Sequence, residues 1–256
     1  MTVDLRLEQL YQRVELVKGI GDPRRGKLCI MSFVALLAGE PHSDSPGAAS
    51  PVIRRFAIPI NDRMPASFRQ CLKPFAPRII GTQDRLDALR AEVLAAAVRD
   101  EIVPRVTLDF GAVPAGAAWL GGLREVREAA QVLLGRLVAG SGANGTFDLP
   151  ENGTFDVPAF QIEIATATAD LLTLGARAAP RSDTAAWYWN KAIDLLDRLC
   201  DISNERAEPG IDWRRIAWLE TILERRARRA RRTAIAARTL EKLRQFLSHS
   251  ADVEDV

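Results

Sequence analysis

A short, almost wholly apolar segment constrains the fold more than any other part of this sequence. The run from Leu28 to Ala38 contains one polar residue, Ser32. A run of this length is too short to cross a bilayer, which needs about 20 residues, and it is longer than most strands. We therefore expect it to form a buried helix at the centre of the core.

The residues on either side of this run give the helix its expected ends. Asp22 can accept backbone N–H groups as an N-cap, and Pro23 already has a helical φ, so the helix is predicted to begin there. Gly39 favours a helix stop, and Pro41 disfavours helical geometry at Glu40. The sequence thus predicts that the helix ends in a loop at Gly39.

This loop holds three side chains of the types that bind metal ions, Glu40, His42 and Asp44. Because a catalytic metal needs about three convergent donors and an open position, a metal-dependent or acid–base enzyme centred on the loop is one functional hypothesis. The three residues are spaced two apart, so their side chains point the same way only if the loop is extended. In the structural alternative, Asp44 caps the next turn and His42 forms hydrogen bonds within the loop. No cofactor is indicated by the sequence.

Signals of several other protein classes are missing. The chain has no Walker loop, no GxSxG and no HExxH motif. Its three cysteines, Cys29, Cys71 and Cys200, are far apart, which is typical of buried, reduced thiols in a cytoplasmic protein. The first 19 residues predict an amphipathic helix rather than a signal peptide, and no segment is apolar enough to span a membrane. We therefore expect a cytoplasmic protein that does not bind membranes.

Seven prolines divide the segment between residues 41 and 77. We expect an irregular lid with short helical pieces at 52–56 and 66–72. The motifs LAGEPHSDSP, SPVIRRFA, NDRMP and LKPFAPRIIGT lie here, and they resemble a pattern in a family of uncharacterised bacterial proteins. The resemblance covers about residues 29–82. It implies a recurrent module and brings no activity and no functional residues with it.

The rest of the sequence predicts an all-α protein in two helical parts. Helices are expected at 84–109, with Leu86, Leu89 and Val93 along its apolar side, and at 123–138, 159–179 and 184–202. The last of them has Asp183 as its expected N-cap and aromatic residues at its start. Two copies of an Asn-Gly repeat, NGTFDLP and NGTFDVP, predict a linker. The expected division is an N-terminal helical module (1–139), the linker (140–158), a C-terminal helical bundle (159–247) and an acidic tail (248–256).

The last helix is predicted from Trp213 to about Leu247, with Asp212 as its N-cap. One stripe of this helix follows steps of three and four residues, which indicates a bundle or coiled-coil seam that would also allow a homo-oligomer. The stripe consists of Ile216, Leu219, Leu223, Ala227, Ala230, Ala234 and Ala237.

Four arginines, Arg225, Arg228, Arg229 and Arg232, lie on another face of this helix. Between residues 214 and 244 the charges sum to 11 − 3 = +8, so the rest of the chain carries 2 − 8 = −6. Three interpretations remain: a solvated basic face helped by Glu220 and Glu224, contacts with nucleic-acid phosphates, or contacts with an acidic protein. We predict a non-enzymatic interaction or regulatory module that binds its partner through this basic helix.

Overall fold

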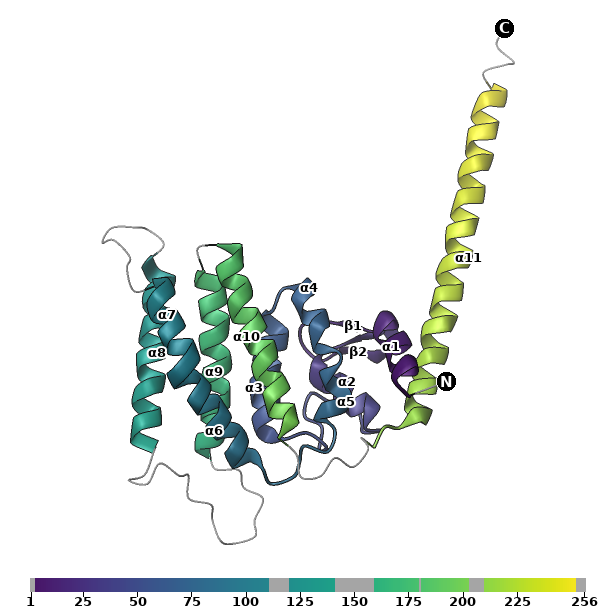
Figure 1. The fold of residues 1–256 in the computed structure, drawn as a ribbon. Coiled ribbons are helices and arrows are strands. Elements are labelled where there is room, and N and C mark those ends of the chain that lie inside the picture. Colours follow the sequence, from purple (N-terminus) through teal and green to yellow (C-terminus); the bar gives the residue numbers. More distant parts are fainter. Residues whose placement is uncertain (1–2, 111–119, 141–158, 180, 203–209, 252–256) are drawn as a thin grey trace.

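The computed structural model describes residues 3–110, 120–140, 159–179, 181–202 and 210–251. This part of the chain is predominantly helical, so the prediction of an all-α protein is confirmed. In Figure 1 most helices form a compact body, and one long helix, α11, projects away from it at the C-terminal end. None of the helices in this part is long and apolar enough to cross a membrane.

The chain begins with the expected amphipathic helix, α1 (Val3–Arg13), which buries Leu7 and Leu10. Three strands of two residues follow, which the sequence patterns did not predict. They are β1 (Glu15–Leu16), β2 (Gly21–Asp22) and β3 (Lys27–Leu28). β3 lies in the middle of this small sheet, parallel to β1 and antiparallel to β2.

The central apolar helix is shorter than predicted. Asp22 caps a single 3-10 turn, η1 (Pro23–Arg25), and Gly26 ends this turn with a left-handed φ of 68°. Helix α2 (Ile30–Leu37) begins only after β3, with the Cys29 sulfur as its capping group. Every residue of α2 is buried, so the prediction of a core helix is confirmed, whereas its predicted start at Asp22 is wrong.

The predicted helical pieces at 52–56 and 66–72 are present, but the proline-rich segment as a whole is more regularly helical than the expected irregular lid. Its elements are α3 (Pro51–Arg63), α4 (Ala66–Arg69), the 3-10 turn η2 (Gln70–Leu72) and α5 (Phe75–Ile79). Pro51 occupies the first turn of α3, where a missing N–H costs little, and Pro59 lies inside the helix. Because α3 buries an apolar face against α9, packing outweighs the cost of Pro59 and places this helix in the core.

The bundle in Figure 1 is built around α9, which contacts α3, α6, α8 and α10. Its further elements are α6 (Asp87–Ala97), the π-helical turn η3 (Val98–Ile102), α7 (Val103–Phe110), α8 (Leu120–Gly140), α9 (Ala159–Ala178) and α10 (Ser182–Asp201). Helices from both sides of the predicted linker therefore share one hydrophobic core. The Asn-Gly repeat itself lies outside the described residues.

The predicted long helix is present as α11 (Trp213–Ala251). Its N-cap is Asp212, whose carboxylate accepts hydrogen bonds from backbone N–H groups 2.9 Å and 3.2 Å away. The first part of the apolar stripe is buried or half-buried through Ile216, Leu219 and Leu223, but all its alanines are exposed. The stripe therefore packs against the body only over its first turns.

Candidate functional site

The loop after α2 does not form a metal-binding group. Both oxygens of the Glu40 carboxylate accept backbone hydrogen bonds, from Gly47 N at 2.7 Å and Ala48 N at 2.8 Å, while His42 and Asp44 are exposed. Across the part of the chain that the structure describes, no three His, Cys, Asp or Glu side chains are placed to hold a metal ion. This geometry gives no support to an enzyme centred on Glu40, His42 and Asp44.

The same loop instead anchors the long helix. Asp212 N donates a hydrogen bond to Leu37 O at 2.7 Å, and the Arg215 guanidinium donates to Glu40 O at 3.2 Å. Gly39 leaves room for this contact, since a Cβ there would lie 2.7 Å from an Asp212 carboxylate oxygen. The loop at Gly39 and Glu40, for which the sequence suggested an enzyme site, therefore joins α2 to the start of α11.

The aromatic residues at the start of α10 belong to the core interface. Tyr188 and Trp189 are buried, and Tyr188 Oη donates a hydrogen bond to the Asp109 carboxylate at 3.0 Å. Burial and the neighbouring Asp109 charge both raise the pKa of Tyr188. The half-buried Trp187 packs under the Arg105 guanidinium, 5.0 Å from its ring centroid. Tyr188 and Trp187 therefore join α10 to α7 through Asp109 and Arg105.

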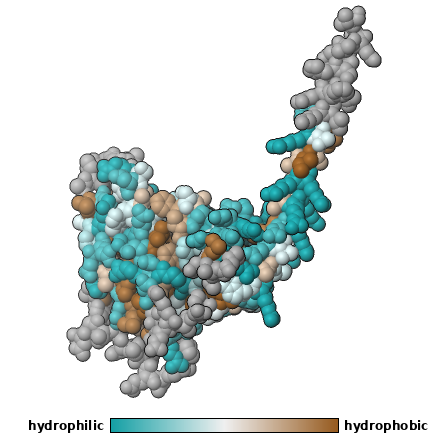
Figure 2. All heavy atoms as spheres, turned by 45° about the vertical axis from the view of Figure 1, so that its right-hand side comes forward, coloured by the Kyte–Doolittle hydropathy of each residue, from teal (hydrophilic) through white to brown (hydrophobic). Residues whose placement is uncertain are grey.

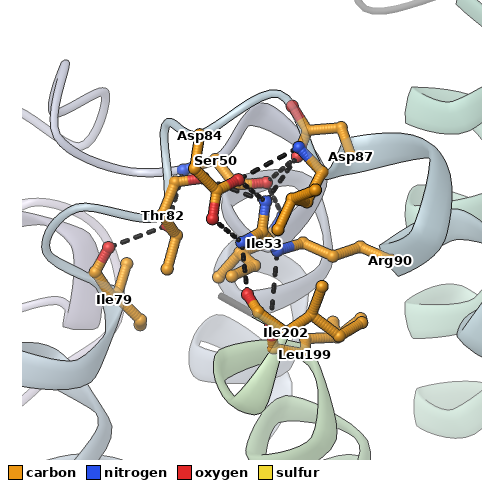
Figure 3. Close-up of polar contacts among 10 residues, drawn as sticks. Ser50, Ile53, Ile79, Thr82, Asp84, Asp87, Arg90, Leu199 and Ile202 are labelled. Carbon is orange, nitrogen blue, oxygen red and sulfur yellow. Dashed lines mark hydrogen bonds and ion pairs between the residues drawn. The ribbon is translucent and has the colours of Figure 1, made fainter. Parts of the chain in front are cut away.

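A buried charge cluster that sequence reasoning missed surrounds Arg90 of α6 (Figure 3). Its guanidinium is fully buried and forms a paired contact with both oxygens of Asp84, each at 2.7 Å. Asp87 lies 3.3 Å away and accepts a hydrogen bond from the Ser50 hydroxyl, which also caps α3. The sequence DRLDALR holds the signal that could have revealed this cluster, because Asp84 and Asp87 precede Arg90 by six and three residues.

Arg90 also joins this cluster to the end of α10. Its guanidinium donates to Ile202 O at 2.7 Å and to Leu199 O at 3.3 Å, as the dashed lines in Figure 3 show. Buried side-chain polar atoms within the described residues all have hydrogen-bond partners. The cluster is therefore saturated by the protein itself, and its arrangement is that of a structural joint rather than a ligand site.

Two ion pairs hold the start of α11 on the body. Arg6 of α1 pairs with Glu220 at 3.2 Å, and Arg13 pairs with Glu224 at 3.3 Å. The guanidinium of Arg6 also lies over the Trp213 ring, 5.0 Å from its centroid. Both glutamates thus pair with arginines of α1, and Glu224 reaches the basic face through one longer contact, 3.9 Å to Arg228.

Beyond residue 224 the helix leaves the body and its described side chains are exposed up to residue 241. Figure 2 shows this projecting part as largely hydrophilic. Seven arginines lie here against one acidic residue, Glu241, a balance of 7 − 1 = +6. Among the described residues, the ion pairs of this segment consist of one long contact, 3.9 Å between Arg228 and Glu224.

The four predicted arginines share one surface. Arg225, Arg228, Arg229 and Arg232 line an open groove of about 490 Å³ together with Ile222, Arg226 and a residue of the body, Arg24 in η1. η1 packs beside α11, so the groove lies where the helix leaves the body. The structure therefore brings the predicted basic residues together and adds Arg24, which sequence spacing alone could not connect with α11.

Comparison with protein-family models, with curated proteins and with solved structures gave no match. The resemblance of residues 29–82 to bacterial proteins therefore stays a prediction.

Proposed function

We propose that this chain is a non-enzymatic module that binds the phosphate backbone of nucleic acid through the projecting part of α11. The observation that carries the proposal is the concentration of seven arginines in residues 225–241, on a helix exposed on all sides. Arginine suits this partner because its planar guanidinium donates paired hydrogen bonds to phosphate oxygens.

The charge distribution supports a partner rather than a merely solvated surface. Like charges three or four residues apart destabilise a helix by about 0.2 to 0.5 kcal/mol per pair, and Arg225, Arg228, Arg229 and Arg232 form such a series. The two glutamates that precede this series pair with α1, and Glu224 reaches Arg228 at the long distance of 3.9 Å, so they relieve little of this repulsion. A polyanion placed along the face would relieve it and would release its own counter-ions on binding.

A second copy of the chain suits the exposed helix less well. A homo-oligomer through the alanine seam would place Arg226 and Arg231, which flank Ala227 and Ala230 on the helix surface, near their own copies. Such like-charge contacts oppose association. A polyanion meets the same arginines with opposite charge, so the observed surface favours nucleic acid over the homo-oligomer.

The salt dependence of binding tests the proposal. Fluorescence anisotropy should show the full chain binding labelled oligonucleotides at low salt. Four phosphate contacts give a log–log salt slope of about −3.6 for a duplex and about −2.8 for a single strand. Changing Arg225, Arg228, Arg229 and Arg232 together to Gln should remove most of this slope, with helix content unchanged by circular dichroism.

A matched variant separates the site from the overall charge. Arg55, Arg99, Arg127 and Arg177 are exposed on other helices, and their joint replacement by Gln removes the same four charges. This control should bind as the unaltered chain does. Equal losses in the two variants would refute a specific surface, and the absence of any binding at low salt would leave an acidic protein as the partner of α11.

A further inference from the structure

One large aromatic side chain on α11 lies outside the core. Trp218 is 43% exposed and does not belong to the hydrophobic cluster, whereas Trp213 packs against that cluster and lies beneath Arg6. Each helical residue turns by about 100°, so Trp218 points about 140° away from the buried stripe of Ile216, Leu219 and Leu223. The side chain therefore faces away from the body.

Trp218 lies in line with the arginines of the groove. By the same helical geometry, Trp218, Arg225, Arg229 and Arg232 fall within about 60° of one another around the axis. The distance along the helix is about 10 Å from Trp218 to Arg225 and about 21 Å from Trp218 to Arg232. The half-buried Ile222, which lines the groove, lies between the aromatic ring and the first arginine.

This face thus combines a flat apolar ring with a row of exposed cations. Arginines attract any nucleic acid, but a duplex stacks its bases inside, where the ring cannot reach them. A single strand can turn a base outward, and every base offers a face that stacks on an aromatic side chain. Ring and cations together therefore match a single strand better than a duplex or an acidic peptide.

We infer that the exposed face of α11 binds single-stranded nucleic acid, with phosphates on Arg225, Arg229 and Arg232 and one base stacked on Trp218. The inference rests on the proposed function and adds to it the kind of strand. It assigns Trp218 a role that is independent of charge. The contribution of the ring should therefore not depend on salt, whereas that of the arginines should.

Three labelled probes of about twenty nucleotides separate these contributions: an oligothymidylate, an abasic strand with the same phosphates, and a duplex. The unaltered full chain should bind the oligothymidylate more tightly than the abasic strand at every salt concentration. Trp218→Ala should weaken oligothymidylate binding by about 5- to 150-fold, the range expected for one stacked base. It should leave abasic binding and the salt slope unchanged, and Trp218→Phe should recover part of the loss.

Leu108→Ala, which removes an exposed apolar side chain from α7, is the control and should change none of these affinities. Circular dichroism checks that each variant keeps its helix content. Equal binding of the abasic strand and the oligothymidylate by the unaltered chain would overturn the role of Trp218 and leave phosphate binding intact. Tighter binding of the duplex than of the oligothymidylate would overturn the single-strand assignment, and no binding of any probe at low salt would overturn both proposals.

Discussion

Replacing Arg90 by Met tests whether the buried charge cluster is a structural joint. The substitution keeps an unbranched side chain but removes the paired contact with Asp84, the contact with Asp87 and the donors to Leu199 O and Ile202 O. Removing one partner of a buried ion pair typically costs about 3 to 5 kcal/mol, because the remaining charge stays buried without compensation. We expect a loss in this range, a large share of the total stability of a domain.

Urea unfolding followed by circular dichroism measures this loss by linear extrapolation. Arg99→Met, at an exposed arginine of the adjoining π-turn, should stay within about 0.5 kcal/mol of the unaltered chain. Arg90→Lys should recover only part of the loss, since an ammonium group cannot form the paired contact with Asp84. A loss below about 1 kcal/mol for Arg90→Met would refute the assignment of Arg90 as the joint between α6 and α10.

Two further predictions concern the contacts of α10. Lys191 donates a hydrogen bond to Glu101 at 2.6 Å, and this bond lowers the pKa of Glu101 below its ordinary value of 4.5. The contact therefore stabilises the fold above pH 4.5, and this stability is lost as the pH falls through the folded-state pKa of Glu101. Thermal melts of Glu101→Gln should therefore decline less between about pH 5 and pH 3 than those of the unaltered chain, and parallel declines would contradict this. Gly175→Ala should destabilise by about 1 to 3 kcal/mol, because the added Cβ would lie 2.5 Å from the Tyr188 ring. Gly135→Ala, where a Cβ meets nothing within 4 Å, should be neutral or stabilising, and equal urea midpoints for the two variants would refute the packing argument.

Local patterns predicted the long elements of this fold well. The ends of α9, the start of α11, the burial of α2 and the capping by Asp212 follow from apolar periodicity and cap chemistry, which act within a few residues. The three short strands could not be predicted in this way. They pair β1 with β3 across an intervening turn, and their two-residue length leaves no alternation to detect.

The predicted buried face of α6 was rotated relative to the observed one. Periodicity favoured Leu86 and Leu89 for the core, but Leu89 is exposed and Ala88, Ala91 and Leu94 are buried. The helix turns this way because Arg90 is buried among partners from segments as distant as α10. A hydrophobic pattern counts arginine as a surface residue, so it cannot anticipate a helix whose orientation is set by a buried ion pair.

Sequence patterns predicted only part of the candidate site. The arginine-rich face was predicted because its residues are neighbours on one helix. Arg24 lines the groove only because tertiary packing places η1 beside α11. The Glu40 carboxylate accepts hydrogen bonds from two backbone N–H groups, which no sequence motif indicates. The spacing of Glu40, His42 and Asp44 suited a metal only in an extended loop, whereas the actual loop folds back onto Glu40.

The order of charges along α11 explains how one helix can be held by the body and still present a basic surface. Its acidic residues, Glu220 and Glu224, fall in the turns that lie against Arg6 and Arg13, so the ion pairs fasten only this first part. No acidic residue follows until Glu241, and the described side chains between Glu224 and Glu241 are exposed. The same distribution therefore pairs the start of the helix with the body and leaves its basic part exposed, so that the polyanion we propose would approach it from the side that carries the exposed Trp218.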